Sequence, residues 1–307
     1  MQFWIILLSL AIGLGVGLSG VLTEQLRRIE EPLIHVALLL LLVAMGIKIG
    51  SSDRIFTNLG SIGITALVIS GASLAGSLVF VKSVSVRLRC IPRSQDPSEE
   101  MVKKEIPYRL TGLIVAAIVI GGIVGYFFVA EGLVSFFDLV VTLTLGLLLF
   151  AVGVSLGLNK KTFAQAFQMG WKVFLLPISV TFGSILGPVV VSFFLKVSPG
   201  EAAAVGAGFG WYSLSAILLT ELHGPELGTV ALISNTFREL ITFVSLPFVV
   251  RYLGTAAGIA SGGATTMDVT LPLIKEVSGG QAVLPAFLSG AILSGLVPIL
   301  VPLLINL

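Results

Sequence analysis

The chain of 307 residues is apolar along most of its length, with 56% hydrophobic residues and only 11% charged ones. Its 18 Lys and Arg nearly balance its 16 Asp and Glu, and the formal net charge of +2 offers no basic excess for a nucleic-acid partner. This composition excludes an ordinary soluble domain and predicts an integral membrane protein whose main partner is the lipid bilayer.

Apolar runs long enough to cross a hydrocarbon core of about 30 Å as helices recur from end to end. They are apolar on every face, which is typical of membrane helices and not of alternating strands. Expected spans lie near residues 3–22, 33–50, 61–82, 111–130, 133–157, 173–196, 202–220, 227–250, 255–277 and 281–306. The seventh and ninth carry Gly and polar residues at membrane depth, so each is either a broken crossing or a re-entrant loop. The predicted fold is an all-α polytopic membrane protein with about 8–10 transmembrane helices.

Lys and Arg are distributed unevenly over the connections between these spans. Twelve lie after the first, third and fifth spans, and three lie in the opposite connections through the sixth. This asymmetry predicts a cytoplasmic polar loop at 83–110, with the N- and C-termini outside the cell membrane. The first span has no basic segment before it, so we expect a retained helix and not a cleaved signal peptide.

The chain repeats a sequence pattern across the loop at 83–110. Residues 43–50 (VAMGIKIG) match residues 150–157 (FAVGVSLG), and Gly13 and Gly17 match a later glycine pair at 121 and 125. The domains predicted from this pattern are a first three-helix repeat, the loop, a second repeat and a C-terminal region, at 1–82, 83–110, 111–197 and 198–307. A unit of three helices reverses its orientation when copied, which makes an inverted-topology pair, as in many secondary transporters. Chance similarity between Gly- and Leu-rich helices is the alternative.

Glycine and polar residues interrupt the C-terminal region first at 206–215 (GAGFGWYSLS). Glycine there permits close helix contact or local unwinding. Trp211, Tyr212 and Ser213 are candidates for lining a cavity. The alternative is a small-residue helix contact with Trp and Tyr in an interfacial belt.

A second interruption lies at 258–272. Gly262 and Gly263 indicate an unwound stretch, and Thr265 or Thr266 would cap a helix that restarts there. A restarted helix would present free N–H groups and a positive dipole end, which is how half-helices hold a substrate carboxylate.

Between these interruptions, residues 233–240 are polar in the middle of an apolar span. In a helix, Asn235 and Glu239 share one face and Arg238 lies on a neighbouring stripe. This face must therefore look into protein or water.

Glu239 and Asp268 are acidic residues in the most apolar third of the chain. An ionisable group at the centre of a membrane helix costs at least about 2.5–3.5 kcal/mol, so it is usually kept for pairing, binding or proton transfer. A buried ion pair between Arg238 and Asp268 is the structural alternative. Such a pair leaves one carboxylate uncompensated and does not explain the neighbouring glycines, amide and threonines.

Several motifs follow one another in the C-terminal third: GFGWYSLS at 208–215, Gly224-Pro225 before Gly228, REL at 238–240, GATTMD at 263–268 and TLP at 270–272. With them the chain closely resembles the bacterial and archaeal lysine exporter family, LysO. The resemblance is dense over 205–300 and looser, though colinear, before that. Thr266 and Val269 stand where relatives carry Ser and Phe, changes that leave the site chemistry intact.

The resemblance implies efflux of L-lysine and of toxic lysine analogues across the cytoplasmic membrane. It also implies that the acidic residues needed for transport are Glu239 and Asp268. These acids would bind the cationic groups of lysine, and the helix restart near Gly263 would bind its carboxylate. No cofactor is expected, and the expected coupling ion is a proton. Protons would be exchanged for lysine because at least one acid binds either a proton or substrate, but not both. Trp211 and Tyr212 would pack on the aliphatic stem of lysine or offer its ammonium a cation–π contact.

Two other functions are weighed against export. A monovalent-cation/proton antiporter would use the same acids and broken helices. An intramembrane enzyme would need a nucleophile beside a base, and Lys275 lies near the end of its segment while no His lies at depth beside a Ser, so no enzyme is expected. The chain has only two histidines, His35 and His223, and this small number argues against a metal site. The sequence does not decide between a monomer and a homo-oligomer.

Overall fold

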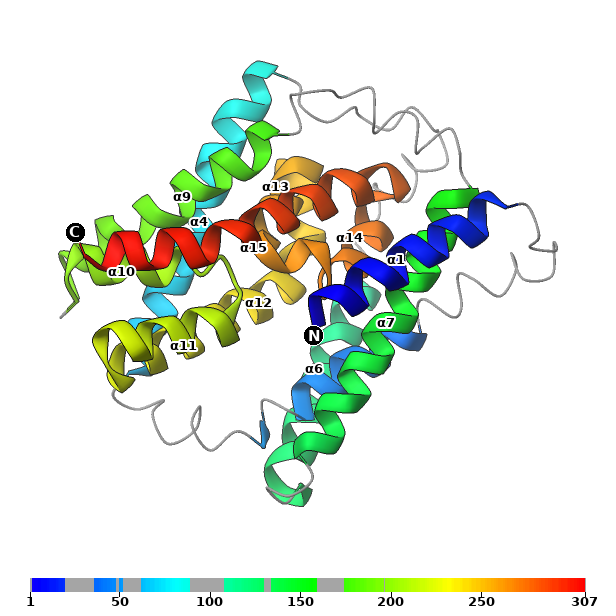
Figure 1. The fold of residues 1–307 in the computed structure, drawn as a ribbon, viewed down its shortest axis with the longest axis horizontal. Coiled ribbons are helices and arrows are strands. Elements are labelled where there is room, and N and C mark those ends of the chain that lie inside the picture. Colours follow the sequence, from blue (N-terminus) through cyan, green and yellow to red (C-terminus); the bar gives the residue numbers. More distant parts are fainter. Residues whose placement is uncertain are drawn as a thin grey trace. The chain divides into compact units, whose positions relative to one another are not determined.

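The computed structural model describes residues 2–19, 36–47, 50–51, 62–88, 108–129, 134–158, 174–195 and 197–306. These ranges are α-helical with short 3-10 stretches, and they contain no strand (Figure 1). The helices are α1 (Gln2–Leu18), α4 (Gly63–Leu88), α6 (Tyr108–Phe128), α7 (Val134–Leu158), α9 (Leu175–Ser192), α10 (Pro199–Gly206), α11 (Tyr212–His223), α12 (Pro225–Leu253), α13 (Thr255–Gly262), η3 (Gly263–Met267), α14 (Leu271–Ser278), η4 (Gly280–Ala282) and α15 (Val283–Ile305). A further helical stretch covers Val36–Ile47.

The helices have the length and composition of membrane spans. Within the described ranges, Gly63–Val84, Leu175–Ser192 and Gly280–Ile305 are long and apolar enough to cross a bilayer, and shorter apolar helices lie at Leu8–Leu18, Val36–Ile47, Gly112–Phe128 and Leu139–Val154. Large apolar side chains on several of these helices, such as Ile120, Phe182 and Ile299, are exposed. An exposed apolar surface of this kind suits lipid and not water. The predicted class, an all-α polytopic membrane protein, is confirmed.

The chain forms two compact units, each drawing helices from distant parts of the sequence. Unit 1 comprises Met1–Asp53, Pro107–Gln168 and Leu271–Val283, and unit 2 comprises Arg54–Ile106, Met169–Thr270 and Leu284–Leu307. The predicted loop at 83–110 is shorter than expected, because α4 continues to Leu88 and α6 begins at Tyr108. The rest of that loop lies outside the described residues.

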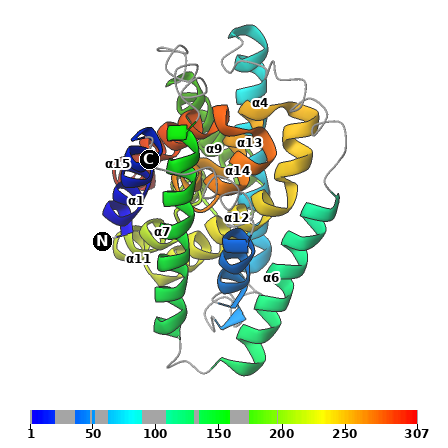
Figure 2. The ribbon, with the colours of Figure 1, turned by 90° about the vertical axis from the view of Figure 1, so that its right-hand side faces the viewer.

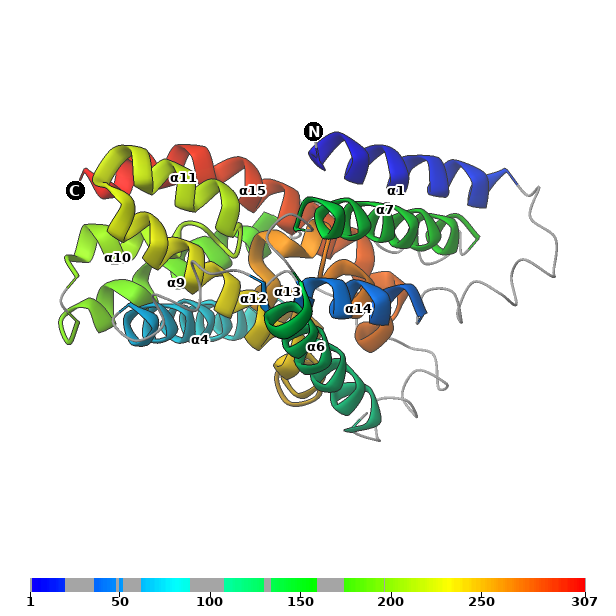
Figure 3. The ribbon, with the colours of Figure 1, turned by 90° about the horizontal axis from the view of Figure 1, so that it is seen from below.

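Glycines bring helix backbones into contact in unit 1. α1 runs along α7 (Figures 2 and 3), where a Cβ on Gly13 or Gly17 would overlap a carbonyl oxygen of α7. The same arrangement recurs between α6 and the helix at 36–47, where a Cβ on Gly121 or Gly125 would overlap a carbonyl oxygen of that helix. Glycine has no Cβ, so it allows the two helix backbones to approach this closely at each position.

The two contacts follow the predicted sequence match. The carbonyl of Phe150 faces Gly13, and the carbonyl of Val43, its counterpart in the match of 43–50 with 150–157, faces Gly121. In unit 2, α4 packs on α9 through a similar approach at Gly76. The recurring contacts support the three-helix repeat, whose inverted orientation stays a prediction.

Gly121→Ala should destabilise the protein, because the new methyl group meets backbone that cannot move aside. We expect a loss of about 1–3 kcal/mol, the usual range for overpacking. Gly112→Ala is the matched control on the same helix, since a Cβ there meets nothing within 4 Å. The control should be neutral or stabilising, by up to about 1 kcal/mol. Thermal unfolding in detergent measures both, and equal effects would contradict this packing.

Candidate functional site

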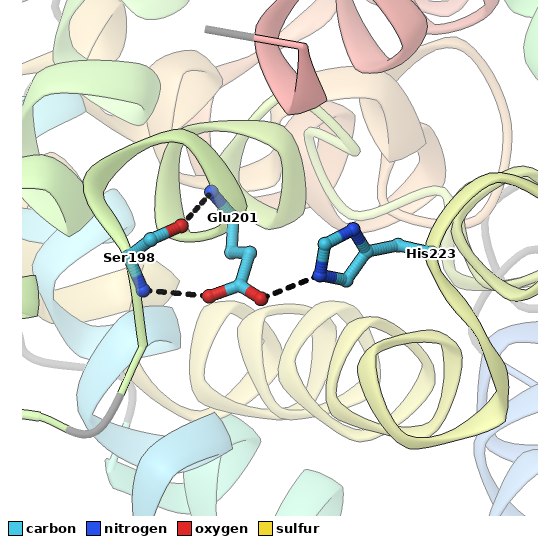
Figure 4. Close-up of polar contacts among 3 residues, drawn as sticks. All are labelled: Ser198, Glu201 and His223. Carbon is cyan, nitrogen blue, oxygen red and sulfur yellow. Dashed lines mark hydrogen bonds and ion pairs between the residues drawn. The ribbon is translucent and has the colours of Figure 1, made fainter.

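The segment at 199–223 is a helical hairpin in unit 2. α10 begins with a capping box: the Glu201 N–H donates to Ser198 Oγ (3.2 Å), and the Ser198 N–H donates to Glu201 Oε2 (2.6 Å). Pro199 occupies the first turn, as is common at helix starts. The other oxygen of the same carboxylate, Oε1, lies 2.7 Å from Nε2 of His223, the last residue of α11 (Figure 4).

This contact joins the two ends of the segment. Two helices of 8 and 12 residues laid end to end would separate Glu201 from His223 by about 30 Å, at 1.5 Å per residue. The chain therefore turns back between α10 and α11. Residues 202–220 therefore form a broken segment whose two ends meet, and whether it re-enters the membrane stays a prediction. Gly224 (φ +105°) then begins α12 at the predicted Gly-Pro turn.

The carboxylate of Glu201 is held in its charged form. Partial burial raises its pKa, but hydrogen bonds from the Ser198 backbone and hydroxyl and the contact with His223 outweigh burial, so the pKa lies below its ordinary value. This contact between Glu201 and His223 closes the open end of the hairpin, at the end of α11 and outside the apolar spans.

The tip of the hairpin is non-helical and buried. Phe209 (φ +50°) is fully buried in a left-handed conformation that a side chain rarely adopts, and Gly210 (φ +97°) follows it. Irregular backbone at membrane depth survives only where the protein satisfies its polar groups. That task falls to Asn235 of α12.

Asn235 ties the tip to α12. The Gly210 N–H donates to Asn235 Oδ1 (2.7 Å). The Asn235 amide nitrogen in turn lies near Val205 O (3.3 Å), Ser215 Oγ (3.2 Å) and Ala231 O (3.0 Å). A Cβ at Gly208 would collide with the same amide, which explains the glycine at that position. Asn235 is thus a positioning residue for both arms of the hairpin.

The second interruption also lies where glycine predicted it, but its interior differs from expectation. α13 ends at Gly262, η3 follows, and the next α-helix begins only at Leu271. Thr265 Oγ1 donates to Gly262 O (3.0 Å), and Thr266 Oγ1 is within 2.8 Å of both Gly263 O and Ala286 O. The prediction that Thr265 or Thr266 caps a restarting helix is wrong, because these hydroxyls donate to backbone carbonyls and the next α-helix begins several residues later, at Leu271.

The two interruptions touch each other. The Ala264 N–H of η3 donates to Phe209 O at the hairpin tip (2.9 Å). Gly263 (φ +62°) permits this contact, since a Cβ there would overlap Phe209 O and press on the Arg238 guanidinium. Two segments separated by 55 positions in sequence therefore form one junction.

Arg238 lies at this junction and is fully buried, with 1% of its surface exposed. Its N–H groups donate to five oxygens: from Nη1 to Ser73 Oγ (2.7 Å) and Ser184 Oγ, from Nη2 to Ser77 Oγ (3.3 Å) and Ala260 O (3.2 Å), and from Nε to Ser261 O (3.3 Å). A guanidinium has five N–H donors, and each has an acceptor here. The predicted alternative of an Arg238–Asp268 ion pair is therefore wrong.

The predicted acids occupy different surroundings. Glu239 is buried on α12, directly after Arg238 and on the polar face expected of residues 233–240. Asp268 is half-buried and follows η3, and its Oδ1 accepts the Val269 N–H (2.6 Å). Both acids belong to unit 2.

The three residues predicted to line a cavity, Trp211, Tyr212 and Ser213, differ in how far they are buried. Trp211 precedes α11 and Tyr212 begins it; both are partly buried, and their backbone N–H groups donate to the tip carbonyls of Gly208 (2.7 Å) and Gly210 (3.0 Å). Ser213 is exposed and does not join the junction.

The serines that receive Arg238 were not predicted. Ser73 and Ser77 lie one turn apart on α4, and Ser184 lies on α9, all buried among apolar residues. Serine is common in membrane helices as a helix-packing residue, so composition alone does not mark these three. The i, i+4 spacing of Ser73 and Ser77 is the signal that was available.

Comparison with known proteins identifies the relatives of this chain. A family model described as lysine exporter LysO matches residues 115–305. The chain is 31% identical over 306 residues to the lysine exporter LysO of Escherichia coli (strain K12), covering 96% of this chain and 97% of that protein. It is also 39% identical over 119 residues to a putative lysine exporter of Haemophilus influenzae, covering 38% of this chain and 60% of that protein.

Asn235→Ala should loosen the hairpin tip. The buried Gly210 N–H loses its acceptor, which costs about 1–3 kcal/mol. The matched control is Thr236→Ala, whose hydroxyl bonds only to Leu232 O of its own helix. Thermal unfolding compares the two variants, and a control that loses as much stability would contradict the role given to Asn235.

Glu201→Gln should make the protein less stable in a pH-dependent way. The lowered pKa of Glu201 means that its charge stabilises the fold above the ordinary carboxyl pKa, and that this contribution disappears as the pH falls through the lowered value. Unfolding temperatures of wild type and variant should differ at neutral pH and converge in acid. Glu226→Gln, which replaces an exposed acid on α12, is the control and should unfold at the wild-type temperature at neutral pH. A gap that is equal at both pH values contradicts the lowered pKa of Glu201.

Proposed function

Because the chain belongs to the lysine exporter LysO family, we propose that it exports L-lysine and related cationic amino acids across the cytoplasmic membrane. Export runs by proton antiport through Glu239 and Asp268. The observation that carries the site assignment is the junction in unit 2, where two interrupted helices meet beside the buried Arg238; Glu239 follows Arg238 on α12 and Asp268 follows η3. Interrupted helices at membrane depth are where secondary transporters bind substrate and coupling ions.

The charges at the junction suit exchange of a proton for a cation. Arg238 adds one positive charge, and Glu239 and Asp268 add two negative charges when both are ionised. One further positive charge, from a proton or from the net charge of lysine, balances the set. Competition of proton and substrate for the same acids then couples their movements.

The donors of Arg238 do not enter this competition. All five point at serine hydroxyls and backbone carbonyls, so the guanidinium does not neutralise Asp268 by a direct contact. Asp268 lies in non-helical backbone and is half-buried, which suits a group that must meet substrate and proton. Glu239, buried on α12, supplies the second acid.

The threonines have a different role from the one that the sequence suggested. The hydroxyl hydrogens of Thr265 and Thr266 serve backbone carbonyls, so these residues shape the 3-10 turn that carries Asp268. We assign them to positioning of the acid and not to binding of the substrate carboxylate.

Glu239→Gln and Asp268→Asn, made separately, should each lower lysine export by about tenfold or more. A lost interaction with a charged group is worth about 1.5–3 kcal/mol, and 1.4 kcal/mol corresponds to tenfold. The amides keep the shape of the carboxylic acids, so folding should be retained. Efflux of labelled lysine from proteoliposomes under an imposed pH gradient measures the rate, and thermal unfolding checks the fold.

Glu226→Gln is the matched control, since Glu226 is an exposed acid on the same helix as Glu239. It should export at the wild-type rate. Normal export by both site variants would overturn the acidic site. Wild-type vesicles that exchange sodium for protons without lysine counterflow would instead establish the monovalent-cation antiporter.

A further inference from the structure

Helix α12 runs between two polar boundaries. Its exposed charged residues are Glu226 in the first turn and Arg251 in the last turn. At 1.5 Å per residue, these two residues lie about 38 Å apart along the helix axis, which matches a hydrocarbon core of about 30 Å with an interfacial layer at each end. α12 is less apolar than the three long spans, because its middle carries buried polar residues. It nevertheless has the length of a complete membrane crossing.

The middle of this crossing is the level of Arg238. Arg238 lies about 18 Å along the axis from Glu226 and about 20 Å from Arg251. The junction of the two interrupted segments, where the Ala264 N–H donates to Phe209 O (2.9 Å), lies against the guanidinium of this residue. The two segments therefore meet halfway along α12.

The hairpin at 199–223 reaches this level from the first-turn end of α12. α11 ends at His223, packs along α12, and is joined to it by Gly224. Its 12 residues extend about 18 Å, the distance from the start of α12 to the junction. α10 begins at the same end, because Glu201 contacts His223 (2.7 Å). Both arms of the hairpin thus start at one boundary.

α13 and η3 reach the junction from the other end of α12. Gly254 joins the last residue of α12 to α13, whose 8 residues return about 12 Å along α12. At this boundary Lys82 Nζ donates to Leu253 O (3.3 Å), and the Arg251 guanidinium lies 5.8 Å from the centre of the Tyr252 ring. Basic and tyrosine side chains are typical of a membrane–water interface.

The two joints of α12 have nearly the same backbone geometry. Gly224 has φ 105° and ψ 169°, and Gly254 has φ 95° and ψ 169°, a conformation that is essentially restricted to glycine. A Cβ at either position would meet nothing within 4 Å. α12 therefore carries one interrupted segment at each end, through a glycine joint that has open space around it.

We propose that residues 199–223 and 255–267 are re-entrant segments that enter the bilayer from opposite faces and close the transport path where they meet. Each segment is hinged at its glycine joint, and substrate reaches the junction from one face when the segment on that face moves away from α12. Moving one segment at a time gives alternating access. Entry from opposite faces is a property of the fold, whereas the closing of the path rests on the proposed function.

Thiol labelling tests the entry from opposite faces. In a Cys90→Ser background, the variants Pro199→Cys, Glu221→Cys and Tyr252→Cys each place one thiol at an exposed position near a boundary. A membrane-impermeant maleimide, applied to intact cells and to inverted membrane vesicles, distinguishes the two faces. A permeant maleimide should label all three variants.

The thiols at positions 199 and 221 should react from one face, and the thiol at position 252 should react from the other. Labelling of positions 199 and 221 from different faces would show a simple crossing and overturn the proposal. Labelling of all three positions from the same face overturns it as well.

A disulfide across the Gly254 joint tests the closing of the path. A Cβ at Gly258 of α13 would lie 3.8 Å from the Cβ of Val250 on α12, the usual separation in a disulfide. Gly258→Cys combined with Val250→Cys, also in the Cys90→Ser background, should therefore form a disulfide on oxidation that holds α13 against α12. Lysine efflux from proteoliposomes should then be lost and should return on reduction.

Val250→Cys alone is the matched control and should export equally with and without oxidant. The oxidised pair should unfold at a temperature no lower than that of the reduced pair, which separates a locked segment from a damaged fold. A pair that forms no disulfide, or that unfolds at a lower temperature when oxidised, contradicts the packing of α13 and overturns the proposal. So does an oxidised pair that exports as fast as the reduced pair.

The labelling experiment is independent of the transport assay. Absence of lysine export by wild type would refute the proposed function, and the labelling pattern would still decide whether the two segments enter from opposite faces.

Discussion

The buried guanidinium of Arg238 is the interaction on which unit 2 depends. Interrupting a helix inside an apolar protein exposes carbonyls that neither lipid nor a helix partner can satisfy. Arg238 satisfies two of them at the end of α13 directly and a third, at the end of α10, through Ser184. A single charge thereby stabilises two helix ends, and its own desolvation is offset by five acceptors.

Asn235 complements Arg238 one turn earlier on α12. Arg238 acts on carbonyls, whereas Asn235 uses both its acceptor and its donors, on the Gly210 N–H and on Val205 O. The uninterrupted helix α12 therefore carries the polar groups that the two interrupted segments lack. Glu239 lies on the same helix, so the scaffold for the junction and one candidate transport acid share one element.

The glycine contacts of unit 1 follow a different principle. They involve no polar side chain and depend only on the absence of a Cβ where carbonyl oxygens approach, as at Gly13 and Gly121. Gly13 and Gly17 match Gly121 and Gly125 at nearly the same offset, so the sequence alone predicted the repeat. In unit 2 the hydrogen-bond partners of Arg238 come from positions that no sequence repeat relates to one another, so no repeat predicts them.

The sequence alone determined the membrane class, the places where helices break and the polar face of α12, because glycine, hydrophobic length and helical spacing are local properties. It also identified Glu239 and Asp268 as acids too costly to keep without a role. Only the tertiary structure decided that residues 202–220 turn back, through the Glu201–His223 contact. It also decided that Arg238 donates to serine hydroxyls and backbone carbonyls and not to Asp268. Those outcomes rest on contacts such as that of Arg238 with Ser73, which lie 165 residues apart in the sequence. Local residue spacing does not predict contacts between residues so far apart along the chain.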